Sequence, residues 1–217
     1  DAYALASYGR ALAAAEAGRF AAEIAPVDVP AGRGKSVAVA ADEEPAPADA
    51  AKLGALRPAF RKDGSVTAAN ASKINDGAAA FVLMSERKAA ELGATPIAKV
   101  RGYADAEQEP VKFTTAPSLA VPVALQRAGV APRDVGCHEI NEAFSVVALA
   151  NMRILGLDHA DVNTLGGAVA LGHPIGMSGA RIVGTLLPAL DARDQAVGCA
   201  SICNGGGGAS ALVLERV

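Results

Sequence analysis

Three segments of this 217-residue sequence combine nucleophilic, basic or amide side chains with glycine. Each falls where an expected strand or helix ends in a loop, which is where α/β proteins tend to bind ligands. The side chains present are suited to acid–base and nucleophilic chemistry. The segments are residues 138–144 (HEINEAF), 166–179 (GGAVALGHPIGMSG) and 199–208 (CASICNGGGG).

The second segment presents a histidine on a constrained loop. Pro174 disfavours helical backbone at His173, while Gly172 and Gly176 allow the sharp turns that would expose the imidazole. This arrangement favours a functional histidine, although a lone histidine is more often structural. A phosphate-binding loop is the other functional interpretation, but the segment lacks the Lys-Ser/Thr pair of a P-loop and the glycine spacing of a dinucleotide site.

The third segment ends an expected strand with a thiol. Cys203 comes shortly before a run of glycines whose backbone N–H groups no side chain would shield, and such donors suit an oxyanion hole. The alternative is an inert buried cysteine. We assign that role to Cys199, which lies on the same strand face, and to Cys137. No Cys-x-x-Cys pair occurs, so a zinc site is not expected.

The first segment offers an amide and a carboxylate at a junction between a strand and a helix. Asn141 could bind a ligand there, or it could simply cap the helix. Glu142 would fall in the first helical turn, where its charge complements the helix dipole. From the residue types alone, both interpretations of Asn141 stay open.

The hydrophobic pattern indicates the elements that must position these segments. The first expected helix buries one face, formed by Leu5, Tyr8, Leu12 and Ala15. Helices are expected over residues 1–18, 85–93, 118–129, 141–156 and 178–190. Extended segments or strands are expected over residues 20–29, 78–84, 96–103, 136–140, 197–203 and 209–214, with a surface linker over residues 32–50 that carries an exposed acidic run.

The order of these elements predicts the fold class. Strands and helices alternate from residue 78 onward, which is typical of an α/β protein. The last two strands are joined by a tight loop and should therefore be antiparallel.

Composition narrows the classes of function. The chain is 51% hydrophobic and 20% charged, which is enough apolar material for a core and excludes a disordered protein. A net charge of −3 does not provide the basic surface that nucleic-acid binding needs. No run of about 18 apolar residues predicts a membrane span. Three cysteines, an odd number, favour a reducing compartment over a disulfide framework.

Together and in order, the three segments resemble the C-terminal signature motifs of the thiolase family. The matching residues are 141–144 (NEAF), 172–179 (GHPIGMSG) and 203–207 (CNGGG), with residues 70–72 (NAS) and 75–78 (NDGA) in addition. Their variants are most similar to mitochondrial-type acetoacetyl-CoA thiolases. The resemblance implies a thiolase-like α/β fold, with a C-terminal domain built on a mixed sheet and part of the loop domain.

The resemblance extends over the whole chain and implies its domain organisation. Residues 1–72 would end the CoA-binding loop domain, residues 73–96 would form the returning strand and helix of the N-terminal domain, and residues 97–217 would form the C-terminal domain. Because the chain opens at Asp1 within a helical pattern and without Met, we interpret it as the C-terminal half of a longer enzyme.

The resemblance also implies a reaction and a role for each site residue. Two acetyl-CoA molecules would give acetoacetyl-CoA and CoA, and the reverse. His173 would activate the nucleophile and polarise the thioester oxygen, and Asn141 would hold a water in the same oxyanion hole. Cys203 would remove the α-proton of the second acetyl-CoA. The backbone N–H of Gly205 would join a second oxyanion hole.

Ligand contacts follow from the same resemblance. Coenzyme A would contact Tyr8, Lys52 and Ser72, whereas Pro47 replaces an arginine that relatives carry ahead of Asp49 and so removes one contact. No organic cofactor beyond the CoA substrate is implied. A potassium ion would be held by the Tyr8 side chain and by the backbone carbonyls of Ala68, Ala69, Ala71 and Val169.

The family's nucleophilic cysteine belongs to its first half, and none of the three cysteines here takes that place. The resemblance therefore implies an N-terminal thiolase half as partner and a homo-oligomer, a dimer or tetramer, in a mitochondrial or cytoplasmic compartment. Neither nucleic acid nor a membrane is expected as a partner. Two alternatives stay open: a longer-chain 3-ketoacyl-CoA thiolase, and a non-catalytic half that binds CoA or assembles with a partner.

Overall fold

A mixed sheet of four strands forms the centre of the fold in the computed structural model, which describes residues 1–45 and 48–217. The strand order is β3 (Ala98–Glu107), β6 (Gly208–Arg216), β5 (Val197–Cys203) and β4 (Cys137–Ile140). Only the β4–β5 pair is parallel; β5–β6 is antiparallel, as the tight loop predicts, and so is β3–β6. The α/β class with a mixed sheet is confirmed.

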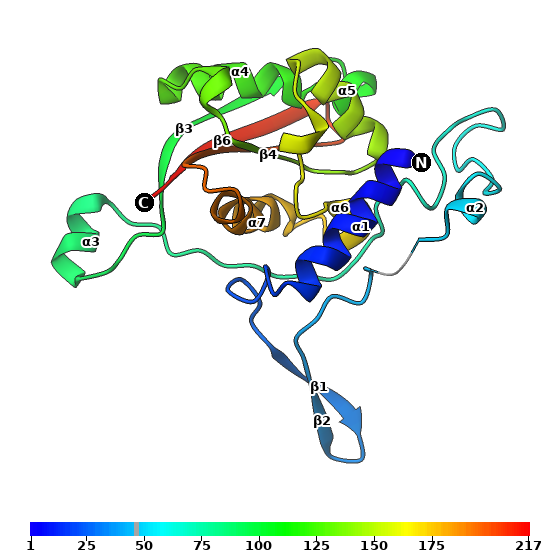
Figure 1. The fold of residues 1–217 in the computed structure, drawn as a ribbon, viewed down its shortest axis with the longest axis horizontal. Coiled ribbons are helices and arrows are strands. Elements are labelled where there is room, and N and C mark those ends of the chain that lie inside the picture. The colour runs from blue at the N-terminus through cyan, green and yellow to red at the C-terminus, as the bar shows by residue number, and fades with distance from the viewer. Residues whose placement is uncertain (46–47) are drawn as a thin grey trace.

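Helices cover both faces of this sheet (Figure 1). α4 (Pro117–Ala128) and α5 (Ser145–Leu155) lie on one face, where Val121 and Leu125 pack against Val213. α7 (Ser178–Ala192) lies on the other, with Ile182 and Leu186 packed into the second cluster of the core. Because β5 is covered on both faces, it is a nearly continuous run of apolar and small residues, whereas β4 buries the polar residues His138 and Glu139.

The first helix, α1 (Ala2–Glu16), packs against the short helix α6 (Ala168–Leu171) through small side chains. The predicted face is wrong in part: Tyr8 is buried, but Leu5 and Leu12 are half-buried and Ala15 is exposed. The buried face is rotated onto small and polar side chains because the loop before α6 approaches the helix backbone closely. These buried residues are Tyr3, Ala4, Ser7, Tyr8, Ala11 and Ala14.

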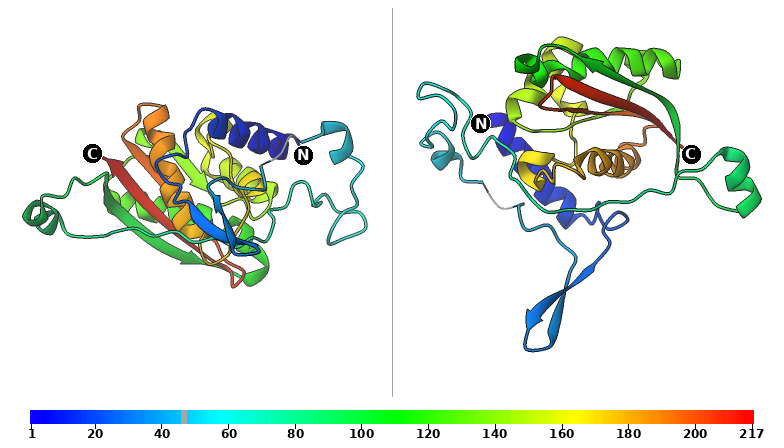
Figure 2. Two further views of the ribbon diagram at one scale, coloured as in Figure 1. Left: turned by 90° about the horizontal axis from the view of Figure 1, so that it is seen from below. Right: turned by 180° about the vertical axis from the view of Figure 1, so that it is seen from behind.

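A β-hairpin replaces the linker expected after residue 32. β1 (Val27–Gly32) and β2 (Lys35–Val39) pair antiparallel, project from the body of the molecule and are fully exposed (Figure 2). Arg33 and Gly34 both have positive φ, as expected of a two-residue hairpin turn. The preceding segment is a turn up to residue 23, so the extended segment at 20–29 is only partly confirmed. The acidic residues Asp42 and Glu43 are exposed as expected.

The strand expected at residues 78–84 is wrong. The structure describes these residues as an exposed segment outside any strand, with Val82 84% and Leu83 81% exposed. An apolar run becomes a strand only when a neighbouring strand accepts its backbone hydrogen bonds, and none of the described strands lies beside it. The following helix, α3 (Glu86–Leu92), is confirmed; Ser85 caps it and Gly93 ends it in the left-handed conformation.

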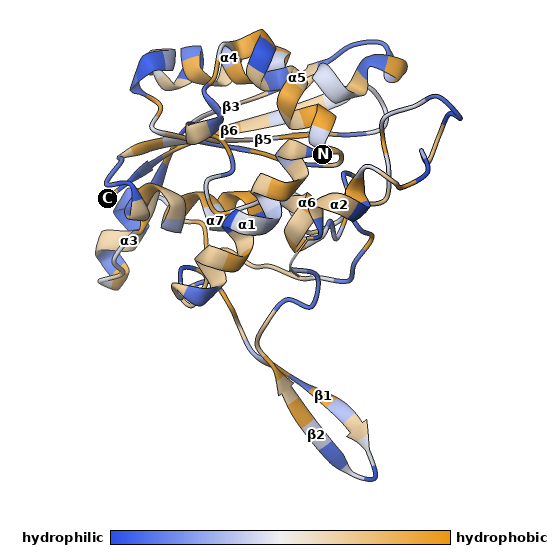
Figure 3. Cartoon of the chain, turned by 45° about the vertical axis from the view of Figure 1, so that its right-hand side comes forward, coloured by the Kyte–Doolittle hydropathy of each residue, from blue (hydrophilic) through white to orange (hydrophobic). Residues whose placement is uncertain are grey.

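Four short helical elements complete the chain: α2 (Ala50–Leu53) and the 3-10 turns η1 (Pro110–Thr115), η2 (Pro132–Asp134) and η3 (His159–Asp161). Hydrophobic and hydrophilic residues are mixed along the hairpin and along α3 (Figure 3). None of the described helices has the length and apolar character needed to cross a lipid bilayer.

Candidate active site

Asn141 and His173 meet at the carboxyl end of β4. The Asn141 side-chain nitrogen lies 3.2 Å from Nε2 of His173. The backbone N–H of Asn141 donates to the Ser201 carbonyl of β5 at 2.9 Å, and the Asn141 side chain is fully buried. Parallel pairing of β4 and β5 brings both strand ends to one edge, so residues about 30 and 60 positions from Asn141 in sequence converge there.

Asn141 does not cap a helix, so the helix-cap interpretation of this residue is wrong. α5 begins only at Ser145, and Phe144 before it is extended and forms a bridge with Ala71. Residues 141–144 are therefore a loop held on both sides, by β5 through Asn141 and by the 70–72 segment through Phe144. The helix predicted from residue 141 is shortened because these tertiary contacts replace its first turn.

The loop that carries His173 is anchored through its backbone. The N–H of His173 donates to the Lys73 carbonyl at 2.9 Å and lies 3.2 Å from the side-chain oxygen of Asn75. Gly172 has φ of 92°, and a Cβ there would lie 2.3 Å from that same oxygen. Glycine at 172 is therefore required for both conformation and space.

Hydrogen bonding around His173 defines its tautomer. The Ser178 hydroxyl donates to the Pro174 carbonyl at 2.9 Å, so its lone pair accepts from Nδ1–H of His173 at 2.5 Å. Nε2 is then the unprotonated nitrogen and faces the Asn141 amide. Burial, and then the positive charge of Arg181, lower the pKa of His173 below its usual value. The imidazole is neutral at neutral pH and can accept a proton at Nε2.

The side-chain oxygen of Asn141 is buried and has no hydrogen-bond partner among the described residues. Such an acceptor is costly unless a water or ligand group completes it. It lies on the same side chain whose nitrogen contacts His173. The Asn141–His173 pair can therefore position one further small polar group.

Cys203 ends β5, the strand that pairs with β4, two residues beyond the Ser201 carbonyl that accepts from Asn141. It packs in one cluster with Ile140 and Phe144, the residues on either side of the Asn141 loop, and burial raises the pKa of its thiol. Cys199 and Cys137 are both only 1% exposed, and burial raises the pKa of their thiols to about 12 and about 11. The core assignment of these two cysteines is confirmed by their burial.

The glycine loop after Cys203 leaves one backbone donor free. The Asn204 side chain accepts from the N–H groups of Gly206 and Gly208 at 3.1 and 3.3 Å, and this folds the loop. In the described chain the N–H of Gly205 donates to no acceptor, and Gly205 is exposed. A free donor two residues from the thiol is suited to binding a developing oxyanion.

A buried carboxylate, Glu142, ties the site to α1 and α6. It accepts from the hydroxyls of Tyr3 and Ser7 at 2.8 Å each, from the Asn163 amide at 2.8 Å and from the Val169 N–H at 3.0 Å. Burial, and then the Glu142 charge, raise the pKa of the Tyr3 hydroxyl well above its usual range, which keeps it a donor. The helix-dipole interpretation of Glu142 is therefore wrong, since its donors come from residues up to 139 positions away.

Replacing Glu142 by alanine is expected to destabilise the assembled protein by about 3–5 kcal/mol, because it leaves buried donors without an acceptor and opens a cavity. Denaturant unfolding measures this. Glu43→Ala is the matched control, because that carboxylate is exposed and its loss should change little. A Glu142→Ala protein as stable as the control would show that the network contributes nothing.

The residues expected to contact coenzyme A occupy three different environments. Tyr8 is buried against α6, whereas the Lys52 side chain is 82% exposed on α2 beside Asp49. The Ser72 hydroxyl is half-buried and donates to the Ala143 carbonyl at 2.9 Å. The expected loss of a contact at Pro47 lies outside the described residues.

Two of the expected potassium ligands contact a lysine side chain. The Lys73 ammonium donates to the Tyr8 hydroxyl and to the Val169 carbonyl, the latter at 3.1 Å. Two of the five expected ligands are therefore bound to a side-chain cation. No cluster of three or more His, Cys, Asp or Glu side chains that could hold a metal occurs in the part of the chain that the structure describes.

Family models identify the chain. The model of the thiolase C-terminal domain matches residues 94–216, and that of the thiolase N-terminal domain matches residues 1–87. The chain belongs to the thiolase family. Two relatives are acetyl-CoA acetyltransferase 1 of Arabidopsis thaliana, 60% identical over 99% of this chain, and the cytosolic acetyl-CoA acetyltransferase ERG10 of Gibberella zeae, 56% identical over 100% of it.

Solved thiolases share the fold of this chain. The Bacillus anthracis acetyl-CoA acetyltransferase superposes with a TM-score of 0.96 at 44% identity, and the human mitochondrial 3-ketoacyl-CoA thiolase with 0.96 at 38%. The Ascaris suum Acat5 thiolase, solved in complex with coenzyme A, gives 0.91 at 50%. All three are covered over 55% of their length and over 100% of this chain. This thiolase chain thus spans about half the length of the relatives it matches.

Proposed function

We propose that this chain supplies the histidine, asparagine, acid–base cysteine and an oxyanion-hole N–H of an acetyl-CoA C-acetyltransferase. The observation that carries the proposal is the contact between Asn141 and the neutral His173 imidazole at the end of β4, the strand paired with β5, which ends at Cys203. The reaction joins two acetyl-CoA molecules into acetoacetyl-CoA and CoA, and also runs in reverse. Relatives named acetyl-CoA acetyltransferase support this choice.

His173 acts first, as a base. Its unprotonated Nε2 takes the proton of a nucleophilic thiol, whose sulfur attacks the acetyl thioester and displaces CoA. The imidazolium then has an N–H that can donate to a thioester oxygen. Asn141 orients the ring, and the water bound by its free carbonyl oxygen provides the second donor of that oxyanion hole.

Cys203 acts in the second half of the reaction. As a thiolate it removes an α-proton of the second acetyl-CoA, and the resulting carbanion attacks the acetyl group held on the nucleophile. The carbon–carbon bond forms first and gives a tetrahedral intermediate, which collapses by breaking the carbon–sulfur bond and releases the nucleophile as a thiolate. The N–H of Gly205 stabilises the oxyanion of the tetrahedral intermediate, because it is a fixed donor without a competing acceptor.

Coenzyme A binding rests on the surface around α1 and α2. The exposed Lys52 can pair with a phosphate, and Ser72 and Tyr8 lie on the segments that flank the Asn141 loop. A similar protein solved in complex with coenzyme A supports coenzyme A as the ligand. The proposal needs no organic cofactor besides the substrate.

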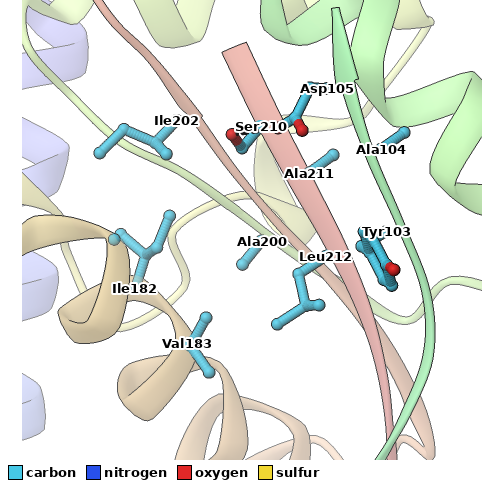
Figure 4. A pocket seen from close by; sticks show the side chains of 11 residues that line it. Tyr103, Ala104, Asp105, Ile182, Val183, Ala200, Ile202, Ser210, Ala211 and Leu212 are labelled. Carbon is cyan, nitrogen blue, oxygen red and sulfur yellow. Dashed lines mark hydrogen bonds between the residues drawn. The ribbon is translucent and has the colours of Figure 1, made fainter. Parts of the chain in front are cut away.

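The nucleophilic cysteine must come from an N-terminal thiolase half. All three cysteines of this chain lie on β4 or β5 in the core or at its edge. The chain also exposes surface that such a half would cover: a groove of about 300 Å³ between α7 and the outer strands, lined mainly by apolar side chains (Figure 4). The apolar segment at residues 78–84 would pair with a strand of that half. We further propose a homo-oligomer, a dimer or tetramer, of the completed enzyme.

One experiment separates this proposal from its alternatives. The protein is isolated in its assembled form, its chain content is determined by intact mass, and thiolysis is measured with 3-ketoacyl-CoA substrates from C4 to long chains. A nucleophile-bearing half and a preference for acetoacetyl-CoA would support the proposal. A preference for long chains would indicate the 3-ketoacyl-CoA thiolase. No turnover and no such half would indicate a binding or assembly role.

A further inference from the structure

Lys73 occupies an unusual environment for a lysine. Its side chain is half-buried, and its ammonium group donates to the Tyr8 hydroxyl and to the Val169 carbonyl. One positive charge is thus bound by a hydroxyl oxygen and a carbonyl oxygen.

Every one of these partners is neutral. In the described part of the chain no carboxylate lies within ion-pair distance of Lys73, whereas Lys52, Lys88, Lys99 and Lys112 each pair with a carboxylate. The residues around Tyr8 and Val169 form an apolar cluster with Ala4, Ala11 and Leu53. Neutral oxygens in an apolar setting bind a cation through oriented dipoles, as a site for a weakly hydrated monovalent ion does.

We propose that the Lys73 ammonium is a built-in monovalent cation at this position, so that the protein takes up no potassium there. A potassium ion bound to the Tyr8 hydroxyl and the Val169 carbonyl would share both oxygens with the ammonium, and two positive charges at such a separation repel strongly. The ammonium is covalently attached, so the binding of free ions cannot compete with it at ordinary salt concentrations.

The Lys73 ammonium connects separate elements of the fold. The Lys73 side chain joins α1, through Tyr8, to α6, through Val169, while the Lys73 backbone carbonyl accepts from the N–H of His173. The ammonium therefore fixes the segment on which the His173 loop rests. The inference concerns stability and ion dependence, and it does not depend on the reaction proposed above.

The test is Lys73→Ser in the assembled protein, with thermal unfolding measured in KCl, NaCl and choline chloride at equal ionic strength. The wild-type Tm should be the same in KCl and in choline chloride. The variant should lose roughly 5 °C in choline chloride and regain it along a saturable KCl curve, because the freed oxygens can then bind the ion. Lys62→Ser, which removes an exposed lysine, is the control and should gain no response to potassium.

Two results would overturn the inference. One is a wild-type Tm that rises along a saturable curve with KCl concentration. The other is a folded Lys73→Ser protein whose Tm does not change with KCl concentration. If the variant does not fold, the test is made on crystals of the wild-type protein soaked in RbCl. Anomalous scattering should show no rubidium between Tyr8 and Val169, and a rubidium peak there would contradict the proposal.

Discussion

Cys203→Ser is expected to slow acetoacetyl-CoA formation by the assembled enzyme about 10²–10⁴-fold, the range attributed to a general acid–base group. Serine nearly preserves the size of the side chain, but its hydroxyl is far too weak an acid to be ionised near neutral pH. Burial already raises the pKa of the Cys203 thiol, so the wild-type condensation rate should rise with pH as the thiolate forms.

Exchange of the acetyl α-hydrogens of acetyl-CoA in D2O isolates this step, because it reports proton removal without carbon–carbon bond formation. Cys203→Ser should lose the exchange together with condensation. Cys199→Ser is the matched control: it lies on the same face of β5, 1% exposed within the core, and should retain both activities in whatever fraction of the protein folds. Wild-type exchange in Cys203→Ser would remove this thiol from the mechanism.

His173→Ala is expected to lower kcat/KM about 10³-fold, because one side chain serves both as base and as oxyanion donor. The variant loses Nε2, which the structure aims at the Asn141 amide, while the backbone contacts of the loop to Lys73 and Asn75 remain. The loss should therefore appear in kcat/KM and not in the free energy of unfolding.

The control for this variant is His159→Ala. That ring stacks on Tyr3 with centroids 4.8 Å apart, outside the Asn141–His173 pair, so its loss should affect stability more than kcat/KM. A His173→Ala enzyme with unchanged kcat/KM would assign His173 a purely structural role, and the proposed mechanism would fail with it.

The local hydrophobic pattern correctly predicted those helices and strands that are stabilised by residues close to them in the sequence. α4, α7 and the β5–β6 hairpin appear close to their expected bounds, because a helical stripe or an apolar run joined by a tight loop carries its own signal. The strand expected at residues 78–84 does not appear, because a strand needs a partner and no described strand lies beside this segment.

The hairpin at residues 27–39 was missed for the opposite reason. Its valines alternate only briefly in each strand, at 27 and 29 and at 37 and 39, and both strands are fully exposed. The Arg33-Gly34 turn is also a weaker signal than Asn-Gly. The start of α5 was misplaced because Asn141 and Glu142 look like the cap and first turn of a helix. Their hydrogen bonds go to other parts of the chain instead.

The sequence by itself determined the chemistry available to this protein: a histidine between glycines, a thiol before a glycine loop and an amide at a strand end, in an order that predicts the family. Those features are local, so they can be recognised from spacing alone. The tertiary structure decided which tautomer His173 adopts, what Glu142 binds and what occupies the oxygens of Tyr8 and Val169. Each of these depends on a partner distant along the chain, and hydrogen bonds of that kind leave no periodic trace in a sequence.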